Sequence, residues 1–248
     1  MSDSDAQDAL TLLAGATLLA VGATDLHLRY VKAEMQPLLL ISGAVLLGLG
    51  LRGLARVVRD VRAGRPADHD PDFEDPEVLH EHSHSVAPSS WLIALPLVVL
   101  ALVAPPSLGS YAAARSETRI AEPTVDLPPL PAARDGAVDL TLTAYYTRVL
   151  YEPETLEGAR LRLTGFVTPV GERWFVTRMS LSCCAADGRP VKVLTAGQQA
   201  ASVPPADTWV EVVGRMVEPE RLGDDPVAVA TLEVEQIRTI PAPADPYE

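Results

Sequence analysis

Two adjacent cysteines have the most distinctive chemistry in this chain. Cys183 and Cys184 are its only cysteines, and Asp187 follows them closely. Neighbouring Cα atoms lie about 3.8 Å apart, whereas ordinary disulfides join Cα atoms about 4.4–6.8 Å apart, so a bond between these two residues would be strained. We therefore expect free thiols, and vicinal thiolates near a carboxylate suit soft cations such as Zn²⁺ or Cu(I).

Three interpretations of the cysteine pair stay open at this point. A free cysteine is commonly buried as a small hydrophobic residue. The thiols could instead bind a metal or take part in redox exchange, or one of them could pair with a cysteine of a partner protein. No histidine follows His84, so the last part of the chain cannot complete a Cys/His zinc site by itself.

A second candidate metal site lies in an acidic, histidine-rich segment between residues 67 and 85. His80, His82 and His84 stand there among aspartates and glutamates, and imidazole and carboxylate are ordinary zinc ligands. In a helix only residues i and i+4 share a face, so the three histidines do not define a tetrahedral cage. The alternative is a solvated linker, because the segment has too few apolar residues to form a core.

Three apolar segments precede the cysteines, at residues 10–28, 37–58 and 91–108. Each is close to the length that crosses a hydrocarbon core about 30 Å thick. We therefore expect three transmembrane helices within residues 1–115, with a polar loop over residues 60–90.

The second apolar segment has further features of a membrane helix. Pro37 suits its first turn, and Ala44 with Gly48 forms a small-xxx-small pair that allows close helix approach. Five arginines lie between residues 52 and 65, whereas the preceding loop has only Arg29 and Lys32. Basic loops stay in the cytoplasm, so we expect a multi-pass protein of the cell membrane with a cytoplasmic N-terminus and an extracellular C-terminal domain.

The C-terminal part predicts an all-β domain over residues 139–248, after a proline-rich linker over residues 116–138 that suits an extended spacer. Residues 140–151 fit either a strand or a short helix. Five strands are then expected from alternating or continuous apolar runs, at residues 160–167, 174–181, 191–194, 209–216 and 227–237.

Five strands with a weak helical stretch near residues 197–203 favour an OB-like barrel, because a sandwich has about seven strands. Gly165 and Gly214 stand inside predicted strands, where a small barrel needs bulges or bends in order to close. The fold class is therefore a membrane α-helical region followed by a five-stranded OB-like barrel.

The charge of the chain limits its partners. The formal net charge is −13, and acidic residues also outnumber basic ones after residue 116, so a nucleic-acid partner is excluded. A small molecule, a divalent cation or a protein is favoured, with membrane lipid around the apolar segments. No nucleophile elbow or HExxH motif occurs, and we expect a protein that is not an enzyme.

Four separated blocks resemble the YcgQ-like permease-subunit family. They are Gly-Phe-Val at 165–167, Phe-Val-Thr-Arg-Met-Ser-Leu-Ser-Cys-Cys-Ala-Ala-Asp at 175–187, Trp-Val-Glu-Val-Val-Gly-Arg-Met at 209–216 and Pro-Ala-Asp-Pro-Tyr-Glu at 243–248. Tyr30, before the second apolar segment, adds to a likeness that covers most of the chain. In that family an aromatic residue follows the last Pro-Tyr, where Glu248 stands here.

The resemblance implies an accessory membrane subunit that works beside a multi-span permease of the YcgR type in a two-component transport system. It leaves the transported species open, with a divalent metal such as zinc as a candidate, and it transfers no catalytic residues. Two other functions stay open: a membrane-anchored thiol, redox or soft-metal protein that uses the cysteine pair, and a module that binds an envelope component.

Overall fold

The computed structural model describes residues 3–64, 106–120, 127–222 and 228–248, together with the pairs 95–96, 98–99 and 123–124. The chain divides into two compact units. One comprises Met1–His27 and Ala33–Pro105, and the other comprises Leu28–Lys32 and Pro106–Glu248. The short segment before the second helix therefore belongs to the same unit as the β domain.

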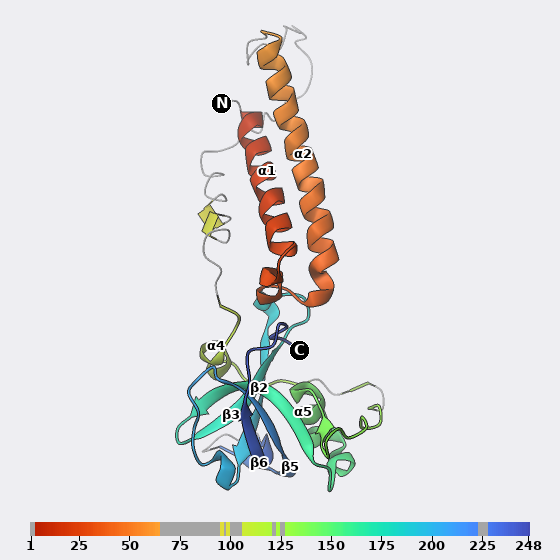
Figure 1. The fold of residues 1–248 in the computed structure, drawn as a ribbon, viewed down its shortest axis with the longest axis vertical. Helices are drawn as coiled ribbons and strands as arrows, with labels where there is room; N and C mark the ends of the chain where they lie inside the picture. Colours follow the sequence, from red (N-terminus) through yellow and green to blue (C-terminus); the bar gives the residue numbers. More distant parts are fainter. Residues whose placement is uncertain are drawn as a thin grey trace, which may run out of the picture. The chain divides into compact units, whose positions relative to one another are not determined.

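The first unit contains a pair of helices that lie side by side, α1 (Asp3–Gly22) and α2 (Gln36–Arg62) (Figure 1). Two short 3-10 turns, η1 (Asp25–Arg29) and η2 (Ala33–Met35), connect them. The stretch Ala33–Arg59, which includes most of α2, is the one described helical segment that is long and apolar enough to cross a membrane.

The prediction of three spanning helices is therefore not supported as it stands. The apolar part of α1 covers Ala6–Gly22, about 25 Å at 1.5 Å per residue, which is less than a hydrocarbon core about 30 Å thick. The helix ends at Gly22 instead of continuing to residue 28, and the short 3-10 turn η1 follows from Asp25. Most of the third predicted segment, 91–108, lies outside the described residues.

Glycines allow α1 and α2 to approach closely. A methyl group added at Gly15 would lie 2.4 Å from the backbone nitrogen of Leu47, and one added at Gly50 would lie 2.7 Å from Cβ of Leu12. The predicted pair Ala44 and Gly48 does not form this contact. Both are exposed, and nothing lies within 4 Å of a methyl group added at Gly48.

The second unit is built on a closed five-stranded barrel (Figure 1), which confirms the predicted OB-like fold. Its strands are β2 (Leu161–Val170), β3 (Arg173–Ser180), β4 (Arg189–Ala196), β5 (Trp209–Arg221) and β6 (Ala228–Thr239). They follow the order β2-β3-β4-β6-β5, and β5 pairs back onto β2. The β4–β6 pair is parallel, the other pairs in the barrel are antiparallel, and the short β1 (Val138–Asp139) lies parallel to β2.

The ambiguous segment 140–151 is a helix, α5 (Leu142–Tyr151), because Thr141 caps it by accepting a hydrogen bond from the backbone N–H of Ala144 at 3.0 Å. Its Tyr145 is fully buried and donates to the Thr231 carbonyl at 2.6 Å. The weak helical stretch near 197–203 contains one 3-10 turn, η6 (Gln198–Ala200).

Both strand glycines are required by close backbone contacts. Gly214 lies at a register shift in the β5–β6 pair, and a methyl group added there would lie 2.1 Å from the Glu233 carbonyl oxygen. The bulge expected at this position is therefore present. At Gly165 the register is continuous, but a methyl group would lie 2.5 Å from the carbonyl oxygen of Thr177.

The proline-rich linker packs against the barrel unit. Arg148 of α5 is buried and donates to the Pro128 carbonyl, and the Leu127 N–H donates to the Glu152 carboxylate at 3.3 Å. Leu130 packs on the main hydrophobic core. The linker thus contributes contacts to the domain in addition to length.

We predict opposite effects for two glycines of α2. Gly50→Ala should lower the free energy of unfolding of the helix pair by about 1–3 kcal/mol, because its methyl group overlaps Leu12. The matched variant Gly48→Ala should be neutral or more stable by up to about 1 kcal/mol, since alanine favours helix and the position is open. Thermal unfolding in detergent, followed by circular dichroism, compares the two. Equal midpoints would show that the glycine contact does not stabilise the pair.

Candidate functional site

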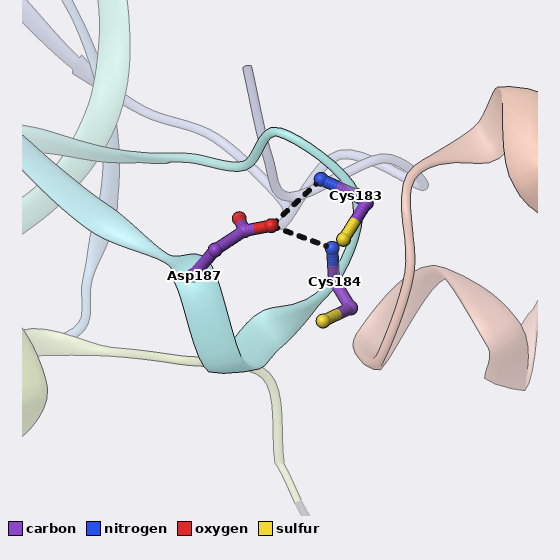
Figure 2. A group of neighbouring side chains, drawn as sticks. All are labelled: Cys183, Cys184 and Asp187. Carbon is purple, nitrogen blue, oxygen red and sulfur yellow. Dashed lines mark hydrogen bonds between the residues drawn. The ribbon is translucent and has the colours of Figure 1, made fainter.

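The cysteine loop, residues 182–188, follows β3 and is folded around the carboxylate of Asp187. One oxygen of this carboxylate accepts the N–H of Ser182 at 2.8 Å, and the other accepts those of Cys183 and Cys184 at 2.8 and 3.3 Å. In return the sulfur of Cys184 accepts the backbone N–H of Asp187, which closes a capping box on the short turn η5 (Ala185–Asp187). Figure 2 shows the bonds from the two cysteines to Asp187.

The loop brings together the three predicted ligands Cys183, Cys184 and Asp187. Their two sulfur atoms and one carboxylate oxygen all lie within 4.8 Å of one another. Cys183 is exposed, Cys184 is half-buried, and both are free. Burial as a small hydrophobic residue therefore does not explain the pair. The other predicted ligands, His80, His82 and His84, lie outside the described residues.

The electrostatics of the loop favour the neutral thiol. Cys183 donates a hydrogen bond to the Asp187 carboxylate, and this bond, with the hydrogen bond to Cys184, raises the pKa of Cys183 to about 11. The same bond and the backbone N–H groups lower the pKa of Asp187 to about 2. Nucleophilic and redox cysteines have a lowered thiol pKa, so the apo loop does not have the properties of an activated thiol.

A segment far away in the sequence pairs with this loop. Val31 forms an antiparallel bridge with Cys184. Two backbone hydrogen bonds flank the bridge, from Lys32 N–H to the Cys183 carbonyl at 3.2 Å and from Ala185 N–H to the Tyr30 carbonyl at 2.7 Å. Segment 28–32 therefore forms part of the site, and sequence reasoning missed this pairing. The cysteine motif was one of the four blocks of the family resemblance and Tyr30 added to that resemblance, which was the available signal.

The end segment, residues 245–248, lies along β3 next to the cysteine loop. Glu248 N–H donates to the Met179 carbonyl, and Leu181 N–H donates to the Glu248 carbonyl, each at 2.9 Å. The hydroxyl of Tyr247 accepts the Leu108 N–H at 3.1 Å and donates to the Arg29 carbonyl at 2.9 Å. One hydroxyl thus links three segments that are distant in the sequence.

Glu248 has a defined structural role where the resemblance has an aromatic residue. Its carboxylate accepts the backbone N–H groups of Leu142 and Thr143, at 2.9 and 3.0 Å, and the Thr143 hydroxyl at 3.0 Å. These are the first N–H groups of α5, where a negative charge is stabilised by the helix dipole. Glu248 therefore connects the end segment to α5.

A groove of about 470 Å³ lies beside the end segment and is lined by charged side chains of several strands. Arg178 stacks over the Trp209 ring at 5.0 Å and donates to the carbonyl groups of Asp245 and Tyr247, and burial lowers its pKa. Arg162 pairs with Asp139 at 2.9 Å. The guanidinium groups of Arg162 and Arg178 form ion pairs with Glu211 and Glu248, while the Nε atom of each has no hydrogen-bond partner among the described residues.

We predict slow alkylation of Cys183 in the full chain carrying Cys184→Ser. The Asp187 carboxylate keeps the pKa of this thiol raised and leaves few thiolates at about pH 8, so the rate with iodoacetamide should be roughly tenfold or more below that of an unstructured cysteine peptide and should still rise above about pH 9. Adding Asp187→Asn removes the carboxylate that stabilises the thiol, and the rate at about pH 8 should increase. A rate that stops rising near pH 9 would contradict the proposed hydrogen bond.

Comparison with known proteins finds a family model that matches the β domain. Residues 138–248 match the family model of the DUF1980 C-terminal domain, and this region contains all four blocks of the resemblance noted above. No curated protein matches the sequence. A solved chain described as an aspartyl-tRNA synthetase from Leishmania major Friedlin has 14% identity and a TM-score of 0.27, over 46% of this chain and 23% of that chain.

Proposed function

We propose that this chain is a membrane-anchored accessory subunit of a two-component permease, with its barrel on the extracellular side and no catalytic activity of its own. The observation that carries the proposal is the pairing of segment 28–32 with the cysteine loop. This pairing ties the barrel domain to the connection between α1 and α2.

The pairing limits the possible topologies. If α2 crosses the membrane, segment 28–32 remains on the side of its N-terminal end. The barrel must then lie on that same side for Val31 to contact Cys184, so the chain has to cross back between residues 63 and 105. The apolar residues of 91–108 can supply this crossing. Basic residues favour the cytoplasmic side, so the arginines of residues 52–65 favour a cytoplasmic C-terminal end of α2. The barrel, on the other side of the membrane, would then lie outside the cell.

The surface of α2 supports a membrane location and leaves room for a partner. Large apolar side chains remain exposed after α1 has packed against it, with exposed fractions from 39% to 72%. They are Leu38, Ile41, Val45, Leu49, Leu51, Leu54, Val58 and Val61. Lipid or the helices of a multi-span subunit would cover this surface.

The contact between α1 and α2 favours an accessory role over an independent transporter. The two helices meet through Gly15, Leu47 and Gly50 at van der Waals distance, so no solute path lies between them. Transport paths in membranes are lined by polar or ionisable side chains, whereas this contact is formed mainly by glycine and leucine, with the carboxylate of Asp8 against Gly53. A partner would therefore supply the path. The redox alternative is less favoured, because the pKa of Cys183 is raised.

The topology predicts which cysteines a membrane-impermeant maleimide reaches in intact cells. Cys183, in the full chain with Cys184→Ser, should be labelled without permeabilisation, at about pH 8 and with long reaction times. In the matched control both cysteines are replaced by serine and Arg62→Cys is added at the exposed end of α2. This cysteine should be labelled only after permeabilisation. The reverse pattern would refute the extracellular barrel.

The permease partnership predicts co-purification. A tagged full chain, crosslinked in the membrane and purified in mild detergent, should bring down one multi-span membrane protein in a fixed ratio. A Val45→Trp/Leu49→Trp variant enlarges the side chains on the exposed face of α2 and should reduce recovery of the partner severalfold. The matched control Gly48→Ala should not change the recovery. Recovery of the chain without any multi-span protein would refute the accessory role.

A further inference from the structure

The cysteine loop holds two free thiols and a carboxylate that the anchoring role does not require. We propose that Cys183, Cys184 and Asp187 bind one thiophilic divalent cation of the zinc class, through two thiolates and one carboxylate oxygen. Binding forms two metal–sulfur bonds and releases the two thiol protons to water, with no change of oxidation state. The site does not depend on the permease partnership, because all three ligands come from this chain.

The distances are close to those of a metal site. The three ligand atoms lie within 4.8 Å of one another. Zinc–sulfur bonds of about 2.3 Å and zinc–oxygen bonds of about 2.0–2.2 Å require ligand atoms about 3.3–3.8 Å apart in a tetrahedral site. The remaining difference of about 1 Å is within reach of side-chain rotation, because Cys183 is exposed and not held by packing.

The loop already holds the Asp187 ligand in place. Three backbone N–H groups fix the Asp187 carboxylate, so its position does not depend on the ion. The Cys183 thiol lies close to this carboxylate, and a cation bound to both residues would replace the thiol proton. The Asp187 N–H already donates to the Cys184 sulfur, and such bonds stabilise a metal-bound thiolate.

The ligand types determine which ions are preferred. Two thiolates and one carboxylate suit Zn²⁺ or Cd²⁺, whereas Mg²⁺ and Ca²⁺ require six or more oxygen ligands. Three protein ligands leave the fourth position open for water or for a ligand from a partner. The ion should therefore exchange, unlike the ion of a closed four-ligand structural site.

Cadmium titration tests the proposal, because Cd²⁺–thiolate bonds give an ultraviolet charge-transfer band that histidine and carboxylate ligands do not produce. The reduced, metal-free full chain in detergent should develop this band with saturation at one Cd²⁺ per chain. Zn²⁺ should abolish the band by competition, and excess Mg²⁺ should not. The matched control His80→Ala/His82→Ala/His84→Ala should retain the band with the same affinity.

Variants of the loop identify the ligands. Cys183→Ser alone should weaken binding by roughly tenfold or more, and Asp187→Asn should weaken it by a similar factor while the band remains. Circular dichroism checks that both variants keep the barrel. Saturation at half a Cd²⁺ per chain, a requirement for millimolar Cd²⁺, or unchanged affinity in Asp187→Asn would overturn the proposal. If the chain binds Cd²⁺ but no multi-span protein co-purifies with it, the metal site is supported and the permease partnership is refuted.

Discussion

The carboxylate of Asp187 is the hydrogen-bond acceptor on which the conformation of the cysteine loop depends. Three backbone N–H groups in the cysteine loop have no strand partner, and two of them belong to the exposed residues Ser182 and Cys183. Asp187 accepts all three, so the loop is held in one conformation. In that conformation the backbone of Cys184 is available to pair with Val31. A local hydrogen-bond arrangement thus creates the edge on which a distant segment pairs.

The end segment strengthens the same region from the other side. Tyr247 lies beside Met179 and its hydroxyl contacts the backbones of Leu108 and Arg29, while Glu248 reaches the N-terminus of α5. The backbones of Leu108 and Arg29 are therefore both joined to the end segment by the hydroxyl of Tyr247.

The cysteines combine a structural role with a chemical one. The backbone of Cys184 forms the bridge to Val31 and its sulfur accepts an N–H, whereas the thiol of Cys183 is exposed and contacts only its neighbours in the loop. An ion bound here would lie on the loop that pairs with segment 28–32.

The sequence by itself determined the features that depend on local pattern. Alternation of apolar and polar residues predicted the five strands, and glycine inside a strand predicted the bulge at Gly214. The spacing of Cys183, Cys184 and Asp187 predicted that their side chains could bind one cation together, since all three lie within one short loop. Strand or helix could not be decided for residues 140–151, because an apolar run of that length fits both periods and the deciding contact is the Thr141 cap.

Only the tertiary structure decided which distant parts of the chain meet. The pairing of Val31 with Cys184 joins residues more than 150 positions apart, and no periodicity in a single sequence records such a contact. The helix contact also depends on rotation about the helix axis: Gly50, and not Gly48, faces α1, because the packed face repeats at three, four and seven residues around Leu47. Composition shows that small residues are present in the helix, whereas the position of the neighbouring helix determines which of them form the contact.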